Sequence, residues 1–137
     1  MFGAEDGNAP AVMVMGDFND GPGKELLERN YMTMDLMTSL QSSLLDPAGA
    51  LGHVLAASPA ADRWTAYFKD YLDPARDPHI LLDNILSTQA LAAGNGPWRI
   101  VPGSGQVEHQ AHEAANQGRI GSDWTSDHRP VSVVVEV

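Results

Sequence analysis

Residues 80–87, Ile-Leu-Leu-Asp-Asn-Ile-Leu-Ser, decide the fold class of this chain. Aliphatic side chains fill the segment on both sides of Asp83, and Asp-Pro pairs at 73–74 and 77–78 precede it. Short aliphatic runs bounded by turn residues are typical of buried strands. Burying a carboxylate in such a strand is costly unless the carboxylate is paired. The segment therefore predicts a buried strand, and Asp83 is predicted to have a partner elsewhere in the chain.

Further strands are predicted on both sides of this segment. Upstream, the apolar run 11–15 (AVMVM) and the aromatic segment 63–67 (RWTAY) have strand composition. Downstream, residues 98–101 are another candidate. In 130–137, valines recur at every second position, which is the pattern of a strand with one buried face.

The remaining segments predict helices and connections. Apolar residues recur at three- and four-residue steps in 24–45, which predicts an amphipathic helix. Residues 46–62 are rich in Pro, Ala and Gly and are expected to connect elements, with one short helix at 51–57. The polar segment 103–125 is expected to be a long loop, and the lead 1–10 is expected to be disordered. Strands and helices together give an α/β class, with a mixed sheet and flanking helices.

The composition of the chain limits the number of domains and the possible classes of function. The 137 residues suit a single domain, and hydrophobic and charged contents of 43% and 19% are those of a globular chain. The net charge of −10, with no run of Lys or Arg, argues against a sequence-independent electrostatic grip on nucleic acid. A phosphate site would need a divalent cation as its source of positive charge. The chain has no cysteine, no signal-peptide pattern and no apolar stretch that predicts a membrane span, and the compartment stays open.

Polar clusters stand at the ends of two predicted strands. Gly-Asp-Phe-Asn at 16–19 follows the first strand, and Ser-Asp-His at 126–128 precedes the last one. Loops at strand ends are where α/β folds place ligand chemistry, although each cluster taken alone also suits an ordinary turn. His128 is a good candidate for the partner of Asp83, and Asp17 could act as a base on water.

These residues resemble three ordered motifs of the endonuclease/exonuclease/phosphatase superfamily, whose members include DNase-like nucleases, sphingomyelinases and inositol polyphosphate phosphatases. The motifs are 16–19 (GDFN), 81–86 (LLDNIL) and 126–128 (SDH), and 63–67 (RWTAY) is similar to an aromatic strand of bacterial members. The resemblance covers about 11–137. It implies metal-dependent hydrolysis of phosphate esters by half of a two-sheet α/β sandwich of the DNase I type.

The resemblance also implies a role for each matching residue. Asp17 would activate the nucleophilic water, and Asn19 would hydrogen-bond the phosphate. Asp83 would orient His128, which would donate to a non-bridging phosphoryl oxygen. Asp127 would assist in binding Mg²⁺ or Mn²⁺.

Two departures from the family pattern change what we expect. Asn84 stands where the family often has His or Tyr, and the family's principal metal-binding Glu lies in an amino-terminal half for which 1–10 has no counterpart. We therefore expect an incomplete domain that by itself binds the metal weakly or not at all and is inactive or dependent on a partner. The missing sheet would leave apolar surface exposed, which favours self-association or binding of the missing amino-terminal half. The alternative is a non-catalytic scaffold or interaction module, and the substrate stays open among nucleic acid, phospholipid and small molecules.

Other conspicuous residues are given structural roles. His109 and His112 have a spacing that could serve a metal site on a helix, but their polar surroundings favour a solvated segment. Trp64, Tyr67 and Trp98 are expected to pack in the core or at its rim. Two other phosphatase classes are disfavoured, because the chain has neither the Asp-x-Asp motif of haloacid-dehalogenase-like enzymes nor the Gly-Asn-His motif of calcineurin-like enzymes.

Overall fold

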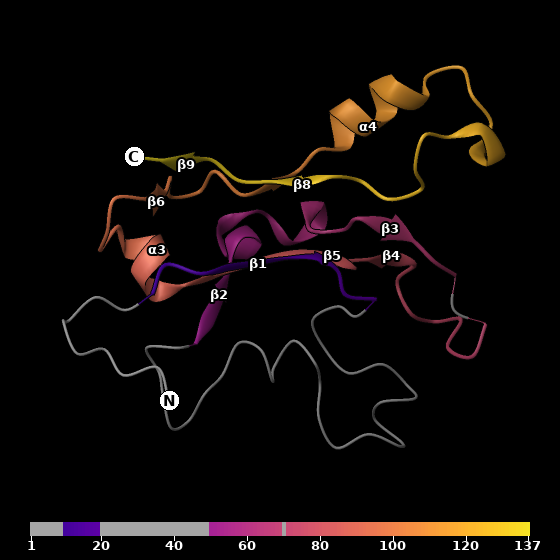
Figure 1. Ribbon diagram of the computed structural model, residues 1–137. Helices are drawn as coiled ribbons and strands as arrows, with labels where there is room; N and C mark the ends of the chain where they lie inside the picture. Colours follow the sequence, from indigo (N-terminus) through magenta and orange to yellow (C-terminus); the bar gives the residue numbers. More distant parts are fainter. Residues whose placement is uncertain (1–9, 20–49, 70) are drawn as a thin grey trace.

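The computed structural model describes residues 10–19, 50–69 and 71–137, and Figure 1 shows small antiparallel sheets with two α-helices. The strands are β1 (Met13–Asp17), β2 (Leu51–His53), β3 (Ala66–Tyr67), β4 (His79–Ile80), β5 (Asp83–Thr88), β6 (Arg99–Ile100), β7 (Gln106–Val107), β8 (Val131–Ser132) and β9 (Val135–Glu136). The helices are α3 (Gln89–Ala93) and α4 (His109–Asn116), with 3-10 turns η2 (Val54–Ala57), η3 (Ala60–Asp62) and η4 (Gly121–Asp123).

Strand β5 is the centre of the largest sheet. It pairs with β1 on one side and β2 on the other, and both pairs are antiparallel. Its side chains are buried from Asn84 to Thr88, which agrees with the aliphatic run that predicted it. Strand β1 begins and ends two residues later than predicted, so that Asp17 belongs to the strand, and Met15 is 61% exposed. The buried apolar side chains are Leu55, Ala66, Leu81, Ile85, Leu86, Ala90, Leu91 and Ile100.

The strand predicted at 80–87 is two strands. Strand β4 pairs with β3, whereas β5 pairs with β1 and β2. Between them, the backbone N–H of Leu82 donates to Thr65 Oγ1, and the Leu82 carbonyl accepts from Phe18 N. The chain therefore changes hydrogen-bonding partner at Leu81 and Leu82, which the continuous aliphatic run did not indicate.

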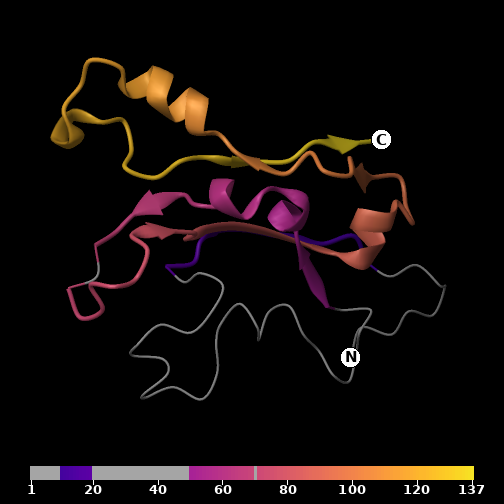
Figure 2. The same cartoon turned by 180° about the vertical axis from the view of Figure 1, so that it is seen from behind.

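The strand predicted at 130–137 is also interrupted. Strand β8 pairs with β7 and β9 pairs with β6, and Figure 2 shows these pairs on one side of the β1–β5–β2 sheet. Between them, Val134 N donates to Ser104 Oγ, and the Val134 carbonyl accepts from Val101 N. Val135 and Val137 are exposed, so the prediction of one buried face was wrong. Every strand pair of the described residues is antiparallel, which contradicts the mixed sheet, and these residues form no clear two-sheet sandwich.

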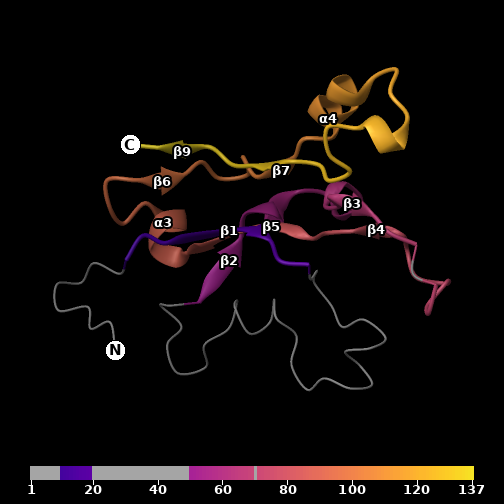
Figure 3. The same cartoon turned by 45° about the vertical axis from the view of Figure 1, so that its right-hand side comes forward.

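The prediction of a long loop at 103–125 was wrong. This segment contains β7, α4 and η4, and Figure 3 shows α4 at the same end of the molecule as β3 and β4. The inward face of α4 carries His112 and Asn116, both buried. Because these side chains are polar, the helix has none of the apolar periodicity by which a helix is predicted.

Two predictions fall largely outside the described residues. The helix expected at 24–45 lies there, as does the lead 1–10 except for Pro10.

The helix expected at 51–57 is replaced by β2 followed by the 3-10 turn η2. Among the described helices, none has the length and apolar character needed to cross a membrane.

Candidate functional site

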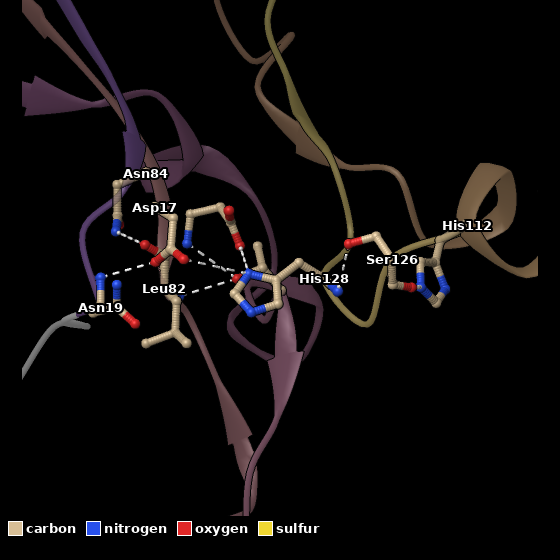
Figure 4. Close-up of polar contacts among 9 residues, drawn as sticks. Asp17, Asn19, Leu82, Asn84, His112, Ser126 and His128 are labelled. Atoms are coloured by element: carbon tan, nitrogen blue, oxygen red, sulfur yellow. Dashed lines mark hydrogen bonds and ion pairs between the residues drawn. The ribbon is translucent and has the colours of Figure 1, made fainter. Parts of the chain in front are cut away.

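Asp17, Asp83 and His128 come together at one end of the β1–β5 pair, and Figure 4 shows Asp17 and His128 there. Asp17 is the last residue of β1 and Asp83 the first of β5, and the antiparallel register places them directly opposite each other. His128 Nδ1 lies 2.8 Å from Asp83 Oδ2 and 4.0 Å from Asp17 Oδ2. One potential ligand atom from each residue lies within 4.8 Å of the others. The predicted pairing of Asp83 with His128 is therefore present.

The register puts two carboxylates face to face, and like charges directly opposite each other destabilise a strand pair. A carboxylate only accepts hydrogen bonds, so His128 Nδ1 carries the proton in its bond to Asp83. This bond holds the imidazole ring by one nitrogen and leaves Nε2 for other interactions. A protonated His128, or a cation bound by the carboxylates, would relieve the repulsion between Asp17 and Asp83.

Asn19 and Asp127 complete the set of residues predicted from the sequence. The backbone N–H of Asn19 donates to Asp17 Oδ1 at 2.9 Å, and Asn19 has a φ of 51°, a left-handed conformation that asparagine tolerates. This tight turn orients the Asp17 carboxylate, and Figure 4 shows Asn19 beside it. Asp127 is exposed and does not belong to the group of three ligand atoms. The structure thus places Asn19 at the site but does not bring Asp127 into it.

Thr65 is a residue of the site that the sequence did not reveal. Its side chain is fully buried, and its Oγ1 accepts from Leu82 N at 3.0 Å and from Asp83 N at 3.1 Å. Its carbonyl accepts from Arg129 N at 2.7 Å. Thr65 therefore holds the backbone of Asp83 and the backbone of the residue that follows His128.

Replacing Thr65 with valine is expected to lower the free energy of unfolding by about 1–3 kcal/mol. Valine has the same shape but no acceptor, so the N–H groups of Leu82 and Asp83 would lose their bonds to the hydroxyl. Chemical denaturation measures the change. Thr65→Ser keeps the hydroxyl and is the control, so equal stabilities of the two variants would contradict this role.

Helix α4 holds the segment that carries His128. His112 Nε2 donates to the Ser126 carbonyl at 2.9 Å, and Asn116 Oδ1 accepts from Thr125 N at 2.8 Å. Ser126 Oγ in turn accepts from His128 N at 3.1 Å, and Figure 4 shows this connection from His112 to His128. His112 is buried, so the prediction of a solvated segment was wrong for this residue. The polar residues around His112 gave no indication that its side chain would be buried against the Ser126 carbonyl.

His53 supports Asp83 from the other side through Asn84, which is 1% exposed. His53 Nε2 donates to Asn84 Oδ1 at 2.9 Å, and His53 Nδ1 accepts from Leu55 N at 3.0 Å. Asn84 Nδ2 donates to the Leu82 carbonyl at 2.8 Å. Both bonds of His53 require a neutral ring with its proton on Nε2.

Stability is expected to fall when the pH drops below about 6.5, the ordinary pKa of histidine. Burial lowers the pKa of His53 in the folded protein, although its bond to Asn84 raises it, and nearby Arg63 lowers it further. The contribution of neutral His53 is present above the unfolded pKa and is lost as the pH falls through the folded pKa. Denaturation at pH 7.5 and at pH 5.5, about one unit either side of 6.5, measures this loss. His53→Gln should show a smaller difference, and an unchanged difference would assign the pH dependence to other groups.

We compared the chain with known protein families, curated proteins and solved structures. No protein-family model, curated protein or solved structure matches the chain. The site is therefore characterised by its own geometry: two opposed carboxylates, a histidine bonded to one of them, and buried polar residues that hold Asp83 and the segment of His128 in place.

Proposed function

We propose that this chain is a metal-dependent phosphoesterase of the endonuclease/exonuclease/phosphatase type, with part of a DNase I-like sandwich as its fold. The observation that carries the proposal is the meeting of Asp17, Asp83 and His128. These residues come from three motifs far apart in the sequence, and the family resemblance implies a catalytic role for each of them.

In the proposed reaction, water attacks phosphorus and the bond to the ester oxygen breaks. Asp17 is 40% exposed and one of its oxygens can accept the proton of the attacking water. His128 is held by Asp83 through Nδ1, so a proton on Nε2 can be donated to a non-bridging phosphoryl oxygen. The departing oxygen takes up a proton from Asp17 or from solvent. Asn19 keeps the Asp17 carboxylate oriented.

The donor set fits one divalent cation. Carboxylate oxygens suit Mg²⁺ and Mn²⁺, and the potential ligand atoms of the group lie within 4.8 Å of one another. Asp17 and Asp83 would hold the ion, because Asp127 lies outside the group. When bound, it supplies the positive charge that a chain of net charge −10 lacks beside a phosphate.

Calorimetric titration with MnCl₂ and MgCl₂, together with hydrolysis of bis(p-nitrophenyl) phosphate, tests the proposal. We expect metal binding, and hydrolysis that chelation by EDTA abolishes. The proposal fails if neither metal binds and no phosphodiester, phosphomonoester or sphingomyelin substrate is turned over.

One observation favours the alternative of a non-catalytic interaction module. His128 already lies close to both carboxylates, so a protonated ring could offset one of their two negative charges without a metal ion. In that case Asp83→Asn would lower the free energy of unfolding, and adding Mn²⁺ would leave the thermal unfolding temperature unchanged. A metal-binding site predicts a higher unfolding temperature in Mn²⁺, and the shift should be lost in Asp83→Asn.

A further inference from the structure

A row of side chains in ring contact begins beside the candidate site and runs onto the β3–β4 hairpin. The guanidinium carbon of Arg129 lies 3.7 Å from the centre of the Trp64 ring. The centres of the Trp64 and His79 rings are 4.3 Å apart, and those of His79 and Tyr67 are 5.5 Å apart. His109 also contacts the Trp64 ring, with centres 4.8 Å apart. We call Arg129, Trp64, His79 and Tyr67 the aromatic row.

The outer end of the aromatic row is open to solvent. Tyr67 is 63% exposed, and the His79 side chain is 44% exposed. The two residues are cross-strand partners, and their rings meet edge to face. The expectation that Tyr67 packs in the core or at its rim therefore does not describe its ring, most of which faces solvent. Exposed aromatic rings on a short hairpin are suited to stacking on a planar ligand.

Basic groups accompany these rings in a chain that is acidic as a whole. Arg129 and His79 belong to the aromatic row, and His109 contacts its Trp64 ring. Lys69 lies exposed two residues beyond Tyr67. Acidic groups also face it: Asp77 bonds to His79 Nδ1 at 2.9 Å, and Glu113 lies near Arg129. Cationic and aromatic groups side by side favour a ligand that carries both an anionic group and a planar ring.

The backbone joins the aromatic row to the candidate site. Trp64 directly precedes Thr65, whose hydroxyl accepts from Asp83 N. Arg129 directly follows His128, and Arg129 N donates to the Thr65 carbonyl. Both inner members of the row are thus one residue away from groups that hold the site. The aromatic row and the candidate site are therefore joined through the backbone of these two segments.

We propose that Tyr67 and His79 form a stacking subsite for a planar heteroaromatic group on the phosphate ester, so that the substrate class is nucleotide-like. This inference rests on the proposed phosphoesterase function, whose site would hold the phosphate end of the same ligand. The ring of the ligand lies against Tyr67, and the guanidinium of Arg129 adds positive charge beside His128.

Two probes that differ by the ring alone test this subsite: adenosine 5′-monophosphate and ribose 5-phosphate, each titrated calorimetrically in the presence of Mn²⁺. We expect the adenine compound to bind about tenfold more tightly, as one stacked base would provide. Tyr67→Ala should remove this preference, and Tyr67→Phe should keep it because the ring is retained. Tyr71→Ala is the matched control, since Tyr71 is an exposed tyrosine in the connection between β3 and β4 and lies outside the row.

Equal affinity for the two probes in the unaltered protein would overturn the subsite, as would a preference that survives Tyr67→Ala or disappears in Tyr71→Ala. Release of inorganic phosphate from both probes separates this failure from that of the proposed function. Equal release from the two compounds would support hydrolysis and reject stacking. Selective binding of the adenine compound, without release from either probe and without turnover of any phosphodiester or sphingomyelin substrate, would support stacking and reject hydrolysis.

Discussion

His128→Ala is expected to lower kcat/KM for bis(p-nitrophenyl) phosphate by about 10²–10⁴-fold, the range for loss of a positioned proton donor. His128 is the member of the site that can carry a proton toward the phosphate, and Asp83 holds it at 2.8 Å. The variant also leaves Asp17 and Asp83 opposed without the imidazole between them, so the free energy of unfolding should fall as well. Steady-state kinetics in Mn²⁺, with folding checked by circular dichroism, measures both effects.

Asp123→Asn is the matched control for this experiment. Asp123 is an exposed carboxylate on the same C-terminal segment, in η4, and it is not part of the group of three ligand atoms. Its rate should stay within about twofold of the unaltered chain, because an exposed group away from the reacting atoms contributes little. If His128→Ala kept the full rate, the measured hydrolysis would come from a contaminant or from another site.

Gly105→Ala is expected to destabilise the fold by about 3 kcal/mol. A Cβ at this position would lie 2.3 Å from the Val54 carbonyl oxygen and 2.7 Å from its carbon. Both atoms belong to the backbone, so no side-chain rotation relieves the clash, and η2 must move away from the segment between β6 and β7. The bond from Ser58 Oγ to the Gly105 carbonyl, at 2.7 Å, would be strained by the same movement.

Gly96→Ala is the control for the clash. A Cβ on Gly96 would meet no atom within 4 Å, so the free energy of unfolding should change by less than about 0.5 kcal/mol. Chemical denaturation of the two variants under one set of conditions compares them. Similar stabilities would mean that the close approach of Gly105 to Val54 does not limit the spacing of the two segments.

Three of the site residues could be predicted from where they stand relative to the apolar strands. Asp83 interrupts an aliphatic strand, and an unpaired carboxylate there would be costly, so a partner was required. Asp17 and His128 stand where a strand ends and where another begins, and these positions expose side chains on a rigid support. The same reasoning favoured Asp127, whose exposed side chain the structure leaves outside the group.

The supporting residues gave no such signal. Thr65 lies in a segment with strand composition, where threonine is common, and its hydroxyl is satisfied by backbone groups far along the chain. His112 and Asn116 lie in a polar segment, and their partners, Ser126 and Thr125, are backbone groups. Hydrogen bonds to the backbone do not depend on the identity of the partner side chain, so the sequence carries no trace of them.

The sequence by itself determined that strands form around 11–15, 63–67, 80–87 and 98–101, and that Asp83 requires a partner such as His128. Local composition suffices for these conclusions, because burial and periodicity are properties of consecutive residues. Only the tertiary structure decided the change of partner between β4 and β5, the interruption of the last strand, the helix α4, and the register that opposes Asp17 to Asp83. The strand pairing and the side-chain contacts of α4 depend on hydrogen bonds between groups distant in the sequence, and such bonds form only after the chain has brought those groups together.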